Sequence, residues 1–224
     1  IIMRKFKDAF RSTEVKTYLI IILASVILIT INCINVFSSV TEALKHSSFQ
    51  VASIITTTGY SSHDFNTWPE FSKTILVVLM FVGACAGSTA GGIKWVRLSI
   101  ILKNGVAEFQ RRIHPNAIIP VKLNEKTIPQ QTINNIMAFL IFYIFIIVIT
   151  VVIFCASGVN FDESIGAAVS AIGNVGISIG QFGPSGTYAE FPTVAKWVMS
   201  FVMLIGRLEI FTVLLLFTRA LWRK

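Results

Sequence analysis

Long apolar runs alternate with short polar segments along the chain. Four runs are long enough to cross the hydrocarbon core of a bilayer, which takes about 20 mostly apolar residues in a helix. They are residues 18–37, 70–103, 133–156 and 192–217. The third run carries no charged residue, whereas the second is interrupted by glycines. The pattern predicts an all-α integral membrane protein in which the second span is broken.

The polar segments divide the chain into two units. Residues 1–16 are basic and polar, and we expect them to form a cytoplasmic lead-in to the first helix. Residues 104–131 contain three of the six prolines and are predicted to form a cytoplasmic linker. The expected units are therefore residues 1–131 and 132–224.

Two shorter stretches, residues 38–57 and 162–173, begin with polar residues and end with small ones. This pattern favours short helices that dip into the membrane from outside, the second one capped by Asp162. They lead into Ser53-Ile-Ile-Thr-Thr-Thr-Gly-Tyr60 and Ser170-Ala-Ile-Gly-Asn-Val-Gly-Ile177, which lie 117 positions apart.

These two stretches are candidate segments of an ion selectivity filter. Non-helical backbone at membrane depth is tolerated only where protein buries it or water lines it. Glycine there permits positive φ, so that carbonyls can turn toward a common axis and replace the hydration shell of a cation. The partly negative C-terminal ends of the short helices also favour a cation. The alternative is a re-entrant turn that only packs two helices together.

The spans after the two stretches also repeat. Lys73 and Lys196 begin equally spaced series in which Met80 corresponds to Met203 and Gly83 to Gly206. Both units enter from the same side, which predicts parallel repeats about an axis along the membrane normal. Such repeats commonly form a transport site at their interface near the midplane.

Composition and charge placement agree with this topology. The chain is 54% hydrophobic and only 13% charged, with a mean hydropathy of +0.74. Of 19 Lys and Arg, five lie in residues 1–17, seven in 94–131 and three in 219–224. This positive-inside distribution predicts that both termini and the central linker are cytoplasmic. The net charge of +8 is therefore a topology signal and does not indicate nucleic-acid binding.

Two features of the spans are candidate gates. Residues 87–92, Gly-Ser-Thr-Ala-Gly-Gly, predict a hinge or constriction below the filter, with helix packing by glycine as the alternative. The stretch resembles a phosphate-binding loop, but Ile93 separates the last glycine from Lys94, so phosphate binding is rejected. Arg207 is costly in a span and is expected either to face the pore as a barrier to cations or to anchor helices through carbonyls. Glu209 is not its expected partner, since residues two apart do not face each other on a helix.

Other chemistry has little support. The cysteines are expected to be buried free thiols, and the histidines His46, His63 and His114 lack metal-like spacing. Outer acidic residues such as Asp64 could concentrate cations at the mouth or simply be solvated. No catalytic set can be argued from spacing.

The motifs together resemble a known family. Besides the first filter stretch they are Ala84-Cys-Ala-Gly-Ser-Thr-Ala-Gly-Gly-Ile-Lys94, Gly173-Asn-Val-Gly176 and Gly206-Arg-Leu-Glu-Ile-Phe211. In this order they resemble the Trk/Ktr/HKT potassium transporter superfamily, most closely its TrkH-type membrane subunits of bacteria. The resemblance implies a potassium-channel-like pore of four helix–pore loop–helix repeats, of which this chain would be the third and fourth.

The resemblance also implies roles for individual residues. The implied filter residues are Thr57, Thr58, Gly59, Tyr60, Asn174, Val175, Gly176 and Ile177. The implied gate residues are Gly87, Ser88, Thr89, Ala90, Gly91, Gly92 and Arg207. Potassium would be the transported ion, with no organic cofactor in this chain.

The expected function is potassium uptake across the bacterial cytoplasmic membrane, with sodium conduction and proton or sodium symport left open. The resemblance implies a homodimer above a cytosolic nucleotide-binding regulatory subunit of the TrkA type. Two filter segments cannot enclose an ion with four-fold coordination, so either an N-terminal half is missing or two copies assemble around one pore. Because the first residue is Ile1 rather than Met, we expect the missing half. The alternatives are a structural or assembly subunit without conduction, or a membrane-embedded enzyme.

Overall fold

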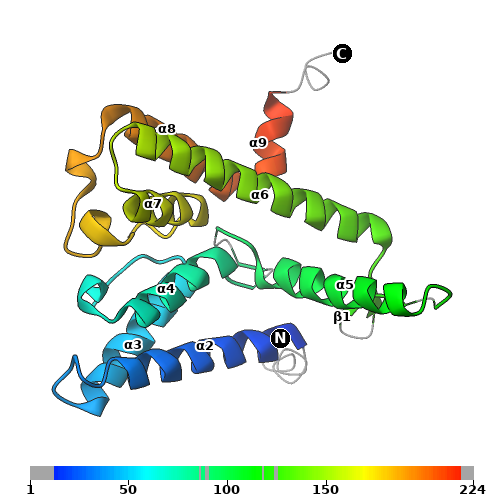
Figure 1. The fold of residues 1–224 in the computed structure, drawn as a ribbon, viewed down its shortest axis with the longest axis horizontal. Coiled ribbons are helices and arrows are strands. Elements are labelled where there is room, and N and C mark those ends of the chain that lie inside the picture. Colours follow the sequence, from blue (N-terminus) through cyan, green and yellow to red (C-terminus); the bar gives the residue numbers. More distant parts are fainter. Residues whose placement is uncertain (1–12, 86, 89–90, 118, 124–125, 218–224) are drawn as a thin grey trace, which may run out of the picture.

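The computed structural model describes residues 13–217 apart from residues 86, 89–90, 118 and 124–125. Its helices form two groups (Figure 1). One contains α2, α3 and α4, and the other contains α6, α7, α8 and α9, with α5 extending between them. The two groups meet where α4 packs against α7.

The first group consists of α2 (Thr13–Asn32), α3 (Val40–Ile55) and α4 (Glu70–Val82). The short helix α3 begins where the side chain of Ser39 accepts a hydrogen bond from the backbone N–H of Glu42 at 3.2 Å, a typical N-cap. Buried apolar residues of all three helices form one core, which includes Ile29, Ile54 and Met80.

The second group consists of α6 (Gln130–Ala156), α7 (Phe161–Gly173), α8 (Thr193–Leu208) and α9 (Ile210–Leu216). Helix α7 is enclosed by its neighbours, because every residue from Gly166 to Gly173 is buried. Its N-cap is Asn160 and not the predicted Asp162, which lies in the first turn. An acidic residue in the first turn still interacts favourably with the helix dipole.

The last predicted span is the main correction to the sequence analysis. Residues 192–217 were expected to form one continuous helix, but α8 and α9 meet at an angle of 112°. Glu209 separates them with a φ of 65°, which an α-helix cannot accommodate. The last predicted span is therefore broken, as the second one is.

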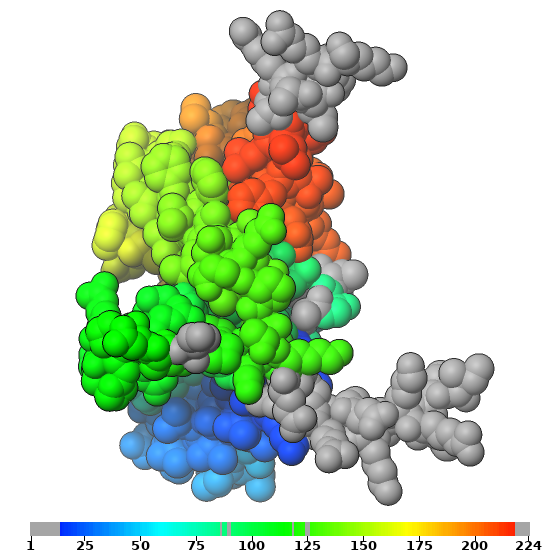
Figure 2. Space-filling model, turned by 90° about the vertical axis from the view of Figure 1, so that its right-hand side faces the viewer, coloured from blue at the N-terminus to red at the C-terminus, as the bar shows by residue number. Residues whose placement is uncertain are grey.

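The second predicted span is divided more widely than expected. Helix α4 ends at Val82, several residues before the predicted interruption at residues 87–92, because Gly83 has a φ of 63°. Helix α5 (Trp95–Ile113) continues well into the stretch predicted as a linker. A small hairpin of β1 (Lys122–Leu123) and β2 (Lys126–Thr127) then precedes α6. Figure 2, seen from this end of the molecule, shows residues of α5 and α6 in front, with α2 and α9 on opposite sides.

The first span is shifted relative to the prediction of 18–37, since α2 begins at Thr13 and ends at Asn32. Three short 3₁₀ turns lie in the loops after α3 and α7: Phe65–Thr67, Gly180–Phe182 and Tyr188–Glu190. Among the described residues, Glu14–Asn32 and Gln130–Ala156 are long and apolar enough to cross a membrane, and the bent pair α8–α9 would be a third span. Their outer faces carry many exposed apolar side chains, as expected for helices in contact with lipid.

Candidate functional site

The first filter stretch is held by Ser53, near the end of α3. The Ser53 carbonyl accepts hydrogen bonds from the backbone N–H groups of Thr58 at 2.8 Å and Gly59 at 3.4 Å. The Ser53 hydroxyl donates to the carbonyl of Tyr60 at 2.5 Å. Thr57 has a φ of 54° and Gly59 a φ of 77°, so the chain reverses within a few residues. One buried serine thus fixes the conformation of the returning backbone.

The second filter stretch is held in a similar way by Ser170, although the Ser170 hydroxyl accepts a hydrogen bond where the Ser53 hydroxyl donates one. The Ser170 carbonyl accepts from the N–H of Val175 at 3.0 Å, and its hydroxyl accepts from the N–H of Gly176 at 3.1 Å. Asn174 has a φ of 55° and Gly176 a φ of 97°. Left-handed backbone therefore occurs at the same places relative to each serine, at residues 57 and 59 and at residues 174 and 176.

The two stretches touch each other at Gly59. A Cβ atom on Gly59 would collide with the carbonyl oxygen of Val175, and the carbonyl carbon is 3.2 Å from that position. Glycine is required at this point both by its positive φ and by the close approach of another backbone. Gly176 is different, because a Cβ atom there would meet nothing within 4 Å.

The predicted filter residues differ in exposure. Val175 is buried, Thr58, Tyr60 and Gly176 are exposed, and the remaining four, Thr57, Gly59, Asn174 and Ile177, are intermediate. The Tyr60 carbonyl already accepts a hydrogen bond from Ser53. The Tyr60 carbonyl oxygen therefore has one lone pair left for another ligand.

The glycine-rich loop between α4 and α5 folds back against α4 and under the second filter stretch. Ile93 donates its backbone N–H to Phe81 at 3.0 Å, and Trp95 donates to Ala84 at 3.1 Å. A Cβ atom on Gly91 would lie 2.5 Å from the Gly173 carbonyl oxygen. The predicted gate residues Gly91 and Gly92 therefore lie on the side of the loop that packs against the rest of the protein.

The other predicted gate residues of this loop are placed differently. Gly87 is exposed and a Cβ atom on it would meet nothing within 4 Å, whereas Ser88 is half-buried. Thr89 and Ala90 lie outside the described residues.

The break in the last span lies against the same filter stretch. A Cβ atom on Gly206 would collide with the Ile172 carbonyl oxygen and lie 2.8 Å from the side-chain nitrogen of Asn174. Gly206 and Gly91 thus both contact the end of α7, so the two broken spans meet at the C-terminal end of this helix.

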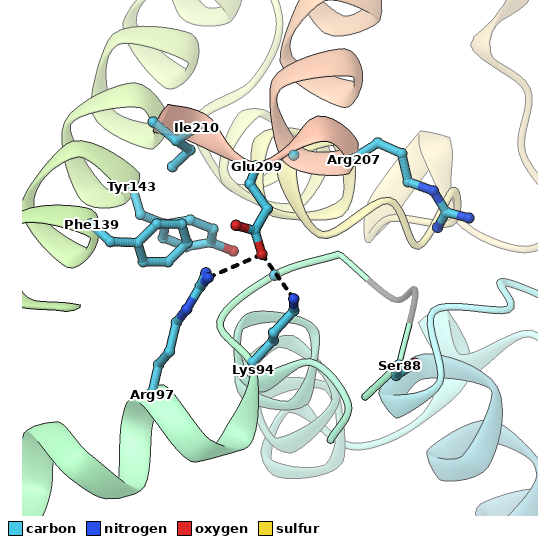
Figure 3. Close-up of a pocket in the computed structure, with 10 residues that line it drawn as sticks. Ser88, Lys94, Arg97, Phe139, Tyr143, Arg207, Glu209 and Ile210 are labelled. Atoms are coloured by element: carbon cyan, nitrogen blue, oxygen red, sulfur yellow. Dashed lines mark hydrogen bonds and ion pairs between the residues drawn. The ribbon is translucent and has the colours of Figure 1, made fainter. Parts of the chain in front are cut away.

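A cluster of charges joins the two breaks (Figure 3). Oε1 of Glu209 lies 2.8 Å from Nζ of Lys94 and 3.0 Å from a guanidinium nitrogen of Arg97. Cζ of Arg97 also lies 4.2 Å from the centre of the Phe139 ring, a cation–π contact. The ion pairs connect residues more than 100 positions apart.

Arg207 lies beside this cluster without joining it. Its side chain is exposed and points away from Glu209 (Figure 3). Within the described part of the chain, no acidic oxygen lies within 4 Å of its guanidinium. A cavity of about 90 Å³ opens here, and its lining includes Lys94, Arg97, Phe139, Tyr143, Arg207 and Glu209.

Sequence reasoning missed two groupings. The first is the ion-pair cluster of Glu209, which left only a weak signal in the sequence, namely charged residues within apolar runs.

The second is an aromatic group in which the rings of His46 and His63 are 5.5 Å apart and both contact Phe37. Trp68 joins it by donating Nε1–H to Nδ1 of His63 at 3.3 Å. No local spacing connects residues 37, 46, 63 and 68.

A family model described as TrkH, cation transport protein, matches residues 12–224 of this chain. The chain belongs to the TrkH family of cation transport proteins. The resemblance found from the sequence motifs is thereby confirmed, and the family is one of transport proteins rather than enzymes.

Individual TrkH relatives match over nearly the whole chain. The Trk system potassium uptake protein TrkH of Halomonas elongata is 38% identical over 223 residues, which are 99% of this chain and 46% of that protein. The protein of the same name from Salmonella typhimurium is 32% identical over 223 residues, with the same coverage of 99% and 46%.

A solved structure supports the fold. The crystal structure of the potassium transporter TrkH from Vibrio parahaemolyticus matches with a TM-score of 0.89 and 29% sequence identity, covering 97% of this chain and 47% of that one. The predicted all-α membrane fold of the TrkH type is confirmed. The chain spans about half the length of the TrkH relatives it matches.

Proposed function

We propose that this chain forms half of a potassium-conducting pore, as the C-terminal half of a potassium uptake subunit. Residues 1–131 would be the third repeat, including the linker, and residues 132–224 the fourth. The contact between Gly59 and Val175 carries this proposal, because it brings two re-entrant stretches of the same backbone conformation together. The relatives named as potassium uptake proteins supply the ion.

The open side of the second stretch supports the number of repeats. Val175 of the neighbouring stretch occupies the space beside Gly59, whereas the equivalent Gly176 is exposed and faces open space. Two further segments, supplied by an N-terminal half, would complete a ring around the ion and cover Gly176. The fraction of each relative that this chain matches fits the same arrangement.

Conduction follows from the filter backbone. A potassium ion would exchange its water for carbonyl oxygens of Thr57 to Tyr60 and Asn174 to Ile177, together with those of the missing half. Because residues 57–60 and residues 174–177 each contain one glycine rather than several, discrimination against sodium should be limited. An inside-negative potential contributes about 2.3 kcal/mol per charge per 100 mV, which drives uptake without ATP hydrolysis by this chain.

The path to the cytoplasm passes the two breaks. The loop containing Gly91 lies directly below Gly173, where it would narrow the path, and Arg207 would oppose the passage of a cation. We therefore assign gating to residues 87–92 and to Arg207.

The surroundings of the subunit are part of the proposal. The distribution of Lys and Arg favours the bacterial cytoplasmic membrane with both ends of this chain inside. By analogy with the family, the complete protein would be a homodimer regulated by a cytosolic nucleotide-binding protein of the TrkA type.

The test is ion flux by the complete four-repeat protein that carries this chain, purified and reconstituted in liposomes. We expect uptake of Rb⁺, a tracer for potassium, when a potassium gradient makes the liposome interior negative. A complete and folded protein without cation flux would reject conduction and leave the role of a structural or assembly subunit.

A further inference from the structure

The cavity below the filter has an unbalanced charge. Three of the four charged side chains that line it, Lys94, Arg97 and Arg207, are positive, and Glu209 is the one acidic residue among those lining it in the described structure. Uncompensated positive charge next to a narrow, partly desolvated passage raises the barrier for a cation. The position of each charge therefore affects conduction directly.

One oxygen of Glu209 pairs with two of these cations, so its single negative charge is shared between them. Its Oε1 binds both Lys94 Nζ and Arg97, while Arg207 points to the other side. Arg97 is further fixed by its stacking on Phe139. Figure 3 shows the three charged side chains converging, so that Lys94 and Arg97 point at Glu209.

The backbone of Glu209 adds an independent observation. Its φ of 65° lies in a region that residues with a Cβ atom rarely adopt and that glycine adopts readily. The break after α4, by comparison, has glycine at its corner, since Gly83 has a φ of 63°. A glutamate at such a corner indicates that its side chain has a role, because strained residues are kept where the surrounding structure uses them.

We infer that Glu209 is a positioning residue that holds Lys94 and Arg97 away from the ion path and offsets part of their charge, which leaves Arg207 as the main barrier. This inference rests on the proposed conduction and extends it to a residue outside the filter, loop and arginine. Glu209 also links the two proposed repeats, because Lys94 lies two residues after Gly92, the last residue of the glycine-rich loop. Its loss is expected to release two cations toward the passage.

The experiment measures Rb⁺ uptake by the complete protein in liposomes, with thermal unfolding as a check on folding. Glu209→Gln should lower the uptake rate about tenfold, since two positive charges lose their partner near the path. Combining Glu209→Gln with Arg97→Gln should restore part of the rate, because one of the released charges is removed. A merely structural role predicts the opposite, namely that the double variant is worse than the single one.

A second variant keeps the test independent of the stability of Glu209→Gln. Arg97→Gln alone leaves Glu209 with one partner and should raise the uptake rate about threefold by making the cavity less positive. The matched control is Glu108→Gln, which removes another ion-paired carboxylate, bound to Arg111 on α5 outside the cavity, and should leave the rate unchanged.

The outcomes separate this inference from the proposed function. An unaltered protein that takes up no Rb⁺ rejects the proposed conduction. Normal uptake by the unaltered protein together with unchanged or faster uptake by Glu209→Gln rejects the role of Glu209 alone. The same holds if the double variant is slower than Glu209→Gln.

Discussion

Replacing Gly59 by alanine tests the contact between the two filter stretches. Gly59 has a φ of 77°, and a Cβ atom there would collide with the carbonyl oxygen of Val175. The colliding atom is backbone, so it cannot rotate away as a flexible side chain could. The substitution must therefore displace one filter stretch relative to the other.

The expected cost has two parts. Left-handed backbone costs a residue with a Cβ atom about 1–2 kcal/mol relative to glycine. Inserting an atom into a well-packed site costs about 1–3 kcal/mol more. We therefore expect Gly59→Ala to destabilise the protein by about 2–5 kcal/mol. Displacement of the Val175 carbonyl should also lower the preference for potassium over sodium, because this carbonyl belongs to the proposed filter.

The assay combines thermal unfolding with Rb⁺ and Na⁺ uptake by the complete protein in liposomes. Gly105→Ala is a matched control, because Gly105 lies within α5, is exposed and has open space at its Cβ position. Alanine there should stabilise the helix by about 1 kcal/mol and leave the uptake ratio unchanged. If Gly59→Ala proves as harmless as Gly105→Ala on both measurements, the filter stretches do not meet as described.

Three further substitutions test neighbouring features. In this chain, the alanine Cβ of Gly176→Ala would meet no neighbour, so only the φ of 97° should cost stability. If another segment covers Gly176 in the complete protein, the loss of stability should be comparable with that of Gly59→Ala. A cost of only about 1–2 kcal/mol would argue against a closed ring. Arg207→Gln should raise Rb⁺ uptake several-fold by removing the barrier charge, and unaltered uptake would assign Arg207 to helix anchoring. Ser53→Ala removes the hydrogen bond to the Tyr60 carbonyl and should cost about 0.5–1.5 kcal/mol in stability with reduced ion discrimination. An unchanged uptake ratio in Ser53→Ala would mean that this hydrogen bond does not shape the filter.

Much of the fold followed from local patterns. The short helices α3 and α7 lie within two residues of the predicted stretches at their C-terminal ends, because the small and polar residues that follow them cannot continue a membrane helix. The break after α4 was predicted from its glycines. The length of α5 is greater than predicted, because the charged residues of the predicted linker up to Ile113 lie on an amphipathic helix.

The break at Glu209 was missed for a clear reason. Neither glycine nor proline occupies the corner, and the nearest glycine, Gly206, lies within α8. The partners of Glu209 come from the start of α5, more than 100 residues earlier. The pairing of Glu209 with Lys94 and Arg97 could therefore not be predicted from spacing along the chain.

Features that depend on the transfer of a local segment into lipid, or on one residue type, could be predicted from the sequence. Apolar length decided which helices can cross a membrane, the positions of Lys and Arg predicted the topology, and glycine marked the sites of reversal. Only the tertiary structure decided which backbones and charges meet, as in Gly59 against Val175, Glu209 between Lys94 and Arg97, and His46 beside His63. The physical reason is that the first set follows from the transfer of local segments between water and lipid, whereas the second depends on how distant segments pack.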